Sequence, residues 1–176
     1  MKPTRLGHSA AVYTMLLLAT TPCLAQDKKS DKEPLRMTTP VACSKIYGFG
    51  SYEALRKPRL TVDDKLVIYY ETTGHTIEKT KDGYRSLLSE DGQVRKKGTK
   101  DLIWKKEKMF VYEAVNKYPP YQVYLKTDVS LKGLPEGDYE IDLTLKDELT
   151  KPAGSVTKSV GFSIYRPEER SADPAR

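Results

Sequence analysis

The sequence predicts an all-β domain, an antiparallel sandwich of about seven to eight strands without an internal disulfide. Two observations carry this prediction. Hydrophobic residues recur with a period of two along the middle of the chain, which is typical of strands with one buried face. Turn residues then break this alternation at short intervals.

Four stretches are long enough to form the main strands. In the clearest, Asp138–Lys146, the apolar residues Tyr139, Ile141 and Leu143 alternate with polar ones. Lys65–Thr73 is apolar on both faces, which indicates a central strand. The other two main strands are expected at Tyr121–Leu131 and Val156–Ile164.

Shorter strands are expected between the main ones. They lie at Ser44–Tyr52, Tyr84–Ser89, Gln93–Lys97 and Leu102–Lys106. Turns are predicted at Asp82-Gly83, Asp91-Gly92, Lys97-Gly98, Pro119-Pro120, Pro135-Glu136-Gly137 and Pro152-Ala153-Gly154. Met109–Lys117 is interpreted as a loop.

The two ends of the chain differ from this middle part. Residues 1–25 resemble a secretory signal: Lys2 and Arg5 precede an apolar run, and Cys23-Leu24-Ala25 provides small residues for cleavage. The run is too short for a membrane span of about 20 residues. Residues 26–40 and 166–176 are charged and contain prolines, so we expect a flexible linker and a disordered tail around a domain at 41–165.

Export with cleavage after residue 25 has chemical consequences. The protein is expected in the periplasm, cell envelope or extracellular space, with no membrane span. The mature chain keeps one cysteine, Cys43, which we expect to be a small buried side chain rather than a reactive thiol. It also keeps one histidine, His75.

Few residues remain for catalysis. A zinc site needs several nitrogen or sulfur ligands, and a catalytic dyad could use only His75. Asp63 and Asp64, or Asp138, Asp142 and Asp147, could contribute to a calcium site, but turn capping and solvation explain these carboxylates more simply. We therefore expect no enzyme activity, no metal and no cofactor.

The charge of the chain leaves two interpretations open. The signal contains two of the 30 basic residues and none of the 24 acidic ones, so the mature charge is +4. The stretch from Arg95 to Lys108 contains seven basic residues and two acidic ones. This stretch either attracts an anionic partner or protects an exposed strand edge. Nucleic acid is not an expected partner outside the cell.

The end of the domain resembles a known group of folds. Leu134-Pro135-Glu136-Gly137-Asp138-Tyr139, followed by two strands that end at Gly161-Phe162-Ser163-Ile164, is similar to the last two strands of bacterial immunoglobulin-like or fibronectin type III-like domains. The resemblance implies that Tyr139 is a buried corner tyrosine whose hydroxyl bonds to the main chain. The segments at 45–52 and 91–98 are similar to parts of small exported bacterial proteins without an established role.

Aromatic residues provide the candidate binding surface. Exposed Tyr and Trp beside cations suit a peptide or the apolar face of a sugar. The candidate partner-binding residues are Trp104, Lys105, Lys106, Lys108, Tyr112, Tyr118, Tyr121 and Tyr124. We expect a non-enzymatic binding or accessory module that contacts an envelope protein or an anionic polysaccharide. The alternative is a structural spacer without a dedicated ligand, and the oligomeric state stays open.

Overall fold

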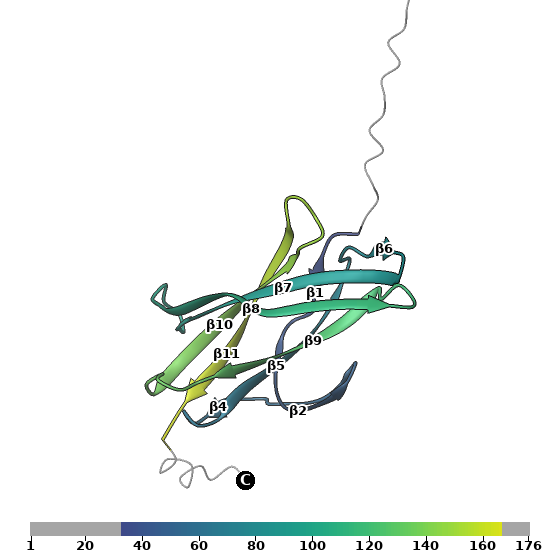
Figure 1. The fold of residues 1–176 in the computed structure, drawn as a ribbon. Coiled ribbons are helices and arrows are strands. Elements are labelled where there is room, and N and C mark those ends of the chain that lie inside the picture. Colours follow the sequence, from purple (N-terminus) through teal and green to yellow (C-terminus); the bar gives the residue numbers. More distant parts are fainter. Residues whose placement is uncertain (1–32, 167–176) are drawn as a thin grey trace, which may run out of the picture. The chain divides into compact units, whose positions relative to one another are not determined.

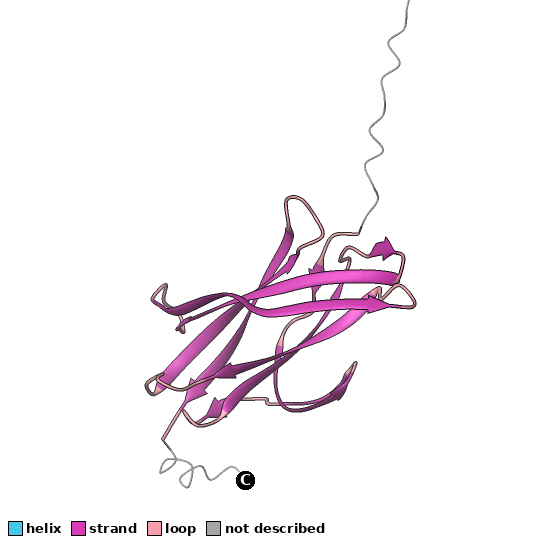
Figure 2. Ribbon diagram, in the orientation of Figure 1, coloured by secondary structure: helices cyan, strands magenta, loops and turns pink. Residues whose placement is uncertain are grey.

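The computed structural model describes residues 33–166, which form two β-sheets and no helix (Figures 1 and 2). The strands are β1 (Arg36–Met37), β2 (Val41–Gly48), β3 (Ser51–Ala54), β4 (Arg59–Leu60), β5 (Lys65–Thr73), β6 (Glu78–Thr80), β7 (Gly83–Lys96), β8 (Leu102–Asn116), β9 (Gln122–Ser130), β10 (Gly137–Asp147) and β11 (Gly154–Ile164). The predicted all-β class is confirmed. The predicted signal at 1–25 and residues 167–176 of the predicted tail lie outside the described residues.

The first sheet is built around β5. Along one edge, β5 pairs antiparallel with β9 at every position, from Lys65 opposite Ser130 to Thr73 opposite Gln122. Along the other edge it pairs with β1 and then with β2, which continues into β3. The central position predicted for Lys65–Thr73 is therefore confirmed.

The second sheet has the order β4-β11-β10-β7, and β8 pairs with the far edge of β7. The β10–β11 pairing is regular over its whole length, from Gly137 opposite Ile164 to Asp147 opposite Gly154. The short β6 continues the β10 side of β7, and the β4–β11 pair is parallel. In consequence, β9 is an edge strand of the first sheet and β8 is an edge strand of the second.

The hydrophobic core lies between the inner faces of the two sheets. Leu66, Ile68 and Tyr70 of β5 are fully buried, and so are Ile141 and Leu143 of β10. Burying a side chain of this kind stabilises the fold by about 1.5–3 kcal/mol. The period-two alternation thus located the core-facing residues of these strands correctly.

Two predicted breaks are wrong, because β7 and β8 are long continuous strands. Asp91-Gly92 lies inside β7 instead of forming a turn. A Cβ atom at Gly92 would lie 2.8 Å from Met109 Cε, so the glycine makes room for a core side chain. Asp91 accepts a hydrogen bond from the Lys108 amide at 2.9 Å and pairs with Lys146 at 2.5 Å. The segment Met109–Lys117, predicted as a loop, belongs to β8 as far as Asn116.

The segment predicted as one strand at Ser44–Tyr52 is a hairpin of β2 and β3. The chain reverses at Phe49-Gly50, where Gly50 has a φ of +66°, a conformation that favours glycine. Near the start of β2, Cys43 is 2% exposed and its thiol donates to the Val41 carbonyl at 3.4 Å. This low exposure confirms the expectation of a buried side chain. Burial also raises the pKa of the thiol.

The first strand of the domain begins earlier than the expected start at residue 41. Arg36 and Met37, assigned by composition to the linker, form β1 against Thr73 and Thr72 of β5. Met37 is 5% exposed and belongs to the core. Two apolar residues, Leu35 and Met37, inside a charged segment are too weak a pattern to predict a strand of this length.

A buried polar group joins the two sheets. Glu90 of β7 is fully buried and accepts hydrogen bonds from Tyr70 of β5 and from Thr127 of β9, the latter at 2.8 Å. Burial raises the pKa of Glu90 above its usual value of 4.5, although both hydrogen bonds oppose this shift. Folding therefore shifts the Glu90 equilibrium toward the neutral carboxyl group.

We predict that Glu90 makes the protein less stable as the pH rises. A carboxyl group whose pKa is raised by folding stabilises the folded state below pH 4.5, and this contribution is lost as the pH rises through the folded pKa. Denaturant unfolding of the wild type and of Glu90→Gln between pH 4 and 9 measures the effect, and about 1 kcal/mol corresponds to each unit of pKa difference. The variant should gain stability relative to the wild type with rising pH. A pH-independent difference would contradict the prediction.

We predict that Gly74 is required for β1 to dock. Gly74 has a φ of +72°, and a Cβ atom there would lie 2.1 Å from the Pro34 carbonyl oxygen. Gly98 is a matched control, since its φ is +74° and a Cβ atom would meet nothing within 4 Å. Gly98→Ala should cost about 1 kcal/mol through backbone strain, and Gly74→Ala at least twice as much. Equal losses in thermal unfolding would refute the role of the Pro34 contact.

Candidate binding surface

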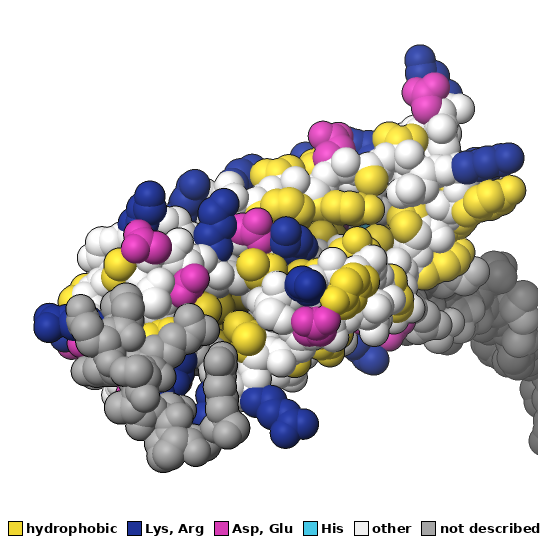
Figure 3. All heavy atoms as spheres, turned by 90° about the horizontal axis from the view of Figure 1, so that it is seen from below, with side chains coloured by type: hydrophobic (Ala, Val, Ile, Leu, Met, Phe, Trp, Pro, Cys, Tyr) yellow, Lys and Arg dark blue, Asp and Glu magenta, His cyan; other side chains and the backbone are white. Residues whose placement is uncertain are grey.

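An open groove lies between β8 and β9, the strands that end the two sheets. Its volume is about 540 Å³. The turn between β2 and β3, β8 and β9 supply its lining: Phe49, Phe110, Tyr112, Gln122, Val123, Tyr124, Leu125 and Lys126. We call it the edge groove. Figure 3 views the molecule from the side where Figure 1 places β2 and β5, and hydrophobic side chains gather there between Lys and Arg side chains.

The edge groove exists because both sheets stop at the same side of the core. Val123 and Leu125 alternate with exposed residues along β9 and face the core. Phe110 and Tyr112 of β8 pair with Glu90 and Leu88 and point to the same interior. With no further strand beyond β8 or β9 in residues 33–166, Phe110 and Tyr112 are left partly uncovered, whereas Val123 and Leu125 are buried.

One wall of the groove continues into an aromatic cluster of Phe49, Tyr52, Tyr69 and Tyr124. Tyr69 stacks on Tyr124, with ring centroids 5.6 Å apart. The ring centroids of Tyr69 and Tyr52 are 4.4 Å apart. Phe49 meets Tyr124 edge-on at 6.4 Å. Tyr69 is buried beneath the others, whereas 49% of Phe49 and 38% of Tyr124 are exposed. The cluster therefore presents aromatic rings on the outer side of the first sheet.

Hydrogen bonds of Tyr69 hold the β2–β3 turn over this sheet. The Gly50 amide donates to the Tyr69 hydroxyl at 2.7 Å, and that hydroxyl donates to Glu71 at 2.6 Å. Burial, followed by the bond to Glu71, raises the pKa of Tyr69 to about 12. A neutral Tyr69 hydroxyl thus fixes the backbone beside Phe49, which positions the Phe49 ring at the groove.

The structure separates the predicted tyrosines into two groups. Tyr112 and Tyr124 both line the edge groove, on β8 and β9. Tyr118 and Tyr121 lie on the connection between these strands and are more than 70% exposed. Lys117 contacts the Tyr118 ring, with the amine 5.5 Å from its centroid.

Trp104 and its neighbouring lysines lie along β8. Trp104 is half-buried, pairs with Val94 and packs against the core beside Gly92. Lys105 pairs with Glu107 at 3.0 Å, and Lys108 approaches Glu148 at 3.6 Å. Lys106 is exposed. Trp104 therefore contributes to packing, while the lysines place positive charge on an edge strand.

The sequence prediction missed most residues of this surface, among them the aromatic residues Phe49, Tyr52 and Phe110. Phe49 stands between two glycines, a signal for a turn with one exposed aromatic residue. Its position beside Tyr124 depends on the β2–β3 hairpin, which lies far from β9 in the sequence. Phe110 was assigned to a loop, so its alternation with Tyr112 was overlooked.

The outer face of the second sheet is polar, and its charges pair with one another. Arg95 bonds to Asp142 at 3.1 Å and also pairs with Glu140. Burial alone would raise the pKa of Asp142, but hydrogen bonds from Arg95, Ser159 and Gln93 lower it below its usual range. This face therefore has fewer charges available for a ligand than its composition suggests.

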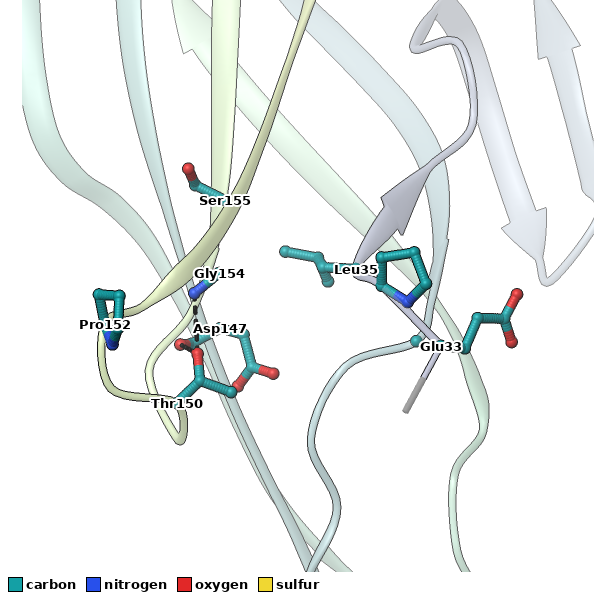
Figure 4. A pocket seen from close by; sticks show the side chains of 9 residues that line it. Glu33, Leu35, Asp147, Thr150, Pro152, Gly154 and Ser155 are labelled. Carbon is teal, nitrogen blue, oxygen red and sulfur yellow. Dashed lines mark hydrogen bonds between the residues drawn. The ribbon is translucent and has the colours of Figure 1, made fainter. Parts of the chain in front are cut away.

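A smaller cavity of about 350 Å³ lies near Gly74, and Figure 4 shows it from close by. Asp147 borders it and accepts hydrogen bonds from the Thr76 amide and hydroxyl, both at 2.6 Å. Glu33 pairs with Arg36 at 3.1 Å, and in Figure 4 its carboxylate points away from Asp147. His75 is 5% exposed and does not line this cavity. The two carboxylates thus serve local structure and do not face a common space.

The described part of the chain lacks two features, a metal-ligand cluster and a membrane-spanning helix. Residues 33–166 contain no group of three or more His, Cys, Asp or Glu side chains arranged to hold a metal ion. Within the same residues, no helix has the length and hydropathy of a membrane span.

We predict that the Tyr69 hydroxyl orders the β2–β3 turn. Tyr69→Phe removes the acceptor of the Gly50 amide and leaves the ring in place. Hydrogen exchange at the Gly50 amide should accelerate about tenfold, because the amide loses its one hydrogen bond to the Tyr69 hydroxyl. Tyr124→Phe is the control, because the Tyr124 ring packs in the same cluster without holding Gly50. Unchanged exchange in Tyr69→Phe would disprove the anchoring role.

The chain was compared with known proteins. It matches no protein-family model, and no curated protein is similar to it.

Proposed function

We propose that the protein is an exported binding module without enzyme activity, and that the edge groove is its contact surface for another protein of the cell envelope. The observation that carries this proposal is the groove itself, where Phe110 and Tyr112 of β8 stay partly uncovered beside the exposed rings of Phe49 and Tyr124. A partly uncovered apolar surface in a soluble domain is typical of an interaction site.

The lining favours a protein over an anionic glycan. Seven of the eight lining residues are uncharged, and six of these are aromatic or aliphatic: Phe49, Phe110, Tyr112, Val123, Tyr124 and Leu125. Aromatic anchors in a partly desolvated pocket are typical of protein contacts. An anionic polysaccharide would need several cations directed to one place, and Lys126 is the one charged residue among those that line the groove.

We also propose that the two sheets form an immunoglobulin-like sandwich, which is compatible with the same interpretation. Tyr139 is 1% exposed, and its hydroxyl donates to the Pro135 carbonyl at 2.6 Å, as the resemblance to such domains implies. Phe162 stacks on the Tyr139 ring at 5.5 Å and supports the corner. Domains of this type serve many purposes, so the fold agrees with binding and does not specify the ligand.

Site-specific cross-linking tests the proposal. A photoreactive phenylalanine analogue replaces Gln122 in the groove, or Thr157 on β11 as a control at the other side of the second sheet. We expect a discrete adduct with one envelope protein from position 122. The yield of this adduct from position 157 should be about tenfold lower, because a few residues of one surface contribute most of the binding energy. Phe110→Ser should reduce the adduct, provided that its thermal unfolding shows a folded protein.

Two outcomes would contradict the proposal. One is no adduct from position 122 in cells that make the protein. The other is equal labelling from positions 122 and 157. Either result favours the alternative, a structural spacer without a dedicated ligand.

A further inference from the structure

We propose that the edge groove takes an extended acidic segment of the partner, which adds to the first sheet as a new strand beside β9. This proposal rests on the proposed function of the groove. It specifies the main-chain geometry and the charge of the occupant.

The first argument is the free backbone edge of β9. All nine residues of β9 pair with β5 on one side. No other strand of residues 33–166 pairs with β9. In a strand paired on one side, about half of the N–H and C=O groups point away from the sheet. These groups form a ready set of donors and acceptors for an added strand.

The regularity of β9 makes this edge suitable for pairing. Its register with β5 contains no irregularity, and its sequence contains no proline or glycine. The edge of β8 differs: its register with β7 shifts twice, and Lys108 adopts a φ of +47°. Lys105, Lys106 and Lys108 also crowd that edge. Bulges and lysines block edge pairing, so the structure protects β8 and leaves β9 open.

The groove follows the backbone of β9 rather than one of its faces. Val123 and Leu125 point to the core, Tyr124 and Lys126 point outward, and all four line the groove. A strand about 4.8 Å from β9 would occupy this space. Its alternate side chains would then meet Phe110 and the neighbouring core on one side, and the aromatic cluster on the other.

The charge of the surroundings selects an acidic occupant. Among the residues that line the groove, Lys126 is charged and none is a carboxylate. Its partner within the chain, Asp128, lies 3.4 Å away and is itself exposed. The mature chain expected after export has a net charge of +4, so a second copy would bring like charge to the same edge. Outward-facing carboxylates on the added strand would instead pair with Lys126.

A synthetic peptide tests the inference directly. The probe is a nine-residue peptide of alternating glutamate and valine, matched to the length of β9. One control carries N-methyl groups on alternate amides, which removes backbone donors and keeps every side chain. A second control has lysine in place of glutamate. Binding to the purified protein is measured by fluorescence anisotropy. We expect the probe to bind about tenfold more tightly than either control.

Charge reversal provides the matched protein variant. Lys126 is exposed and outward-facing on β9, so Lys126→Glu leaves the core intact. This variant should prefer the lysine peptide over the glutamate peptide. In hydrogen exchange, addition of the probe to the wild type should slow every second amide of β9 about tenfold, since only one alternate set faces the groove.

Each failure has a distinct meaning. Equal binding of the N-methylated peptide, or no slowing of β9 amides, overturns strand addition while a cross-link from position 122 still supports a protein-binding groove. No binding of the glutamate peptide at about 1 mM also overturns strand addition. A concentration-dependent dimer with the same alternate protection assigns the edge to a second copy and overturns the peptide occupant. Loss of the cross-link itself refutes the proposed function.

Discussion

The hydrogen bonds of Glu90 fix how the two sheets meet. One carboxyl group on β7 reaches across the core to Tyr70 on β5 and to Thr127 on β9. A buried carboxyl group without partners would destabilise the fold, so the sheets must keep the register that supplies both hydroxyls. Apolar contacts between sheets are less specific, because they tolerate small shifts. This one polar contact therefore sets where β9 lies relative to β7, and hence relative to β8.

The position of β9 determines the edge groove. Thr127 joins β9 to the buried carboxyl, and its neighbours Leu125 and Val123 follow on the same face toward the open side. On β7, Glu90 pairs with Phe110 of β8, so the two groove walls are connected through the same residue. The two final strands are thus held apart at a fixed separation rather than folded onto each other. An apolar groove with an unpaired backbone edge is the result.

The aromatic cluster shows how a structural contact shapes a surface. Tyr69 serves the fold, because its hydroxyl holds Gly50 and its ring is buried. The same contacts place Phe49 and Tyr124 at the groove with their rings partly exposed. Trp104 illustrates the opposite case. Its type suggested a ligand contact, whereas its half-buried ring packs against the core beside Gly92. An aromatic side chain becomes available to a partner only where the local packing leaves it uncovered.

Alternation along the sequence determined the strand class, the central place of β5 and the core-facing residues of β9 and β10, because side-chain direction in a strand is a local property with a period of two. Burial of Cys43 was expected from its residue type, and the Tyr139 corner was implied by the resemblance to immunoglobulin-like domains. Alternation did not predict that β7 and β8 are continuous, since Gly92 is explained by Met109 from another strand. It also missed Phe49 and Phe110 as groove residues. Which strands end the sheets, and which side chains meet there, was decided by pairings between distant segments, and these exist only in the tertiary structure.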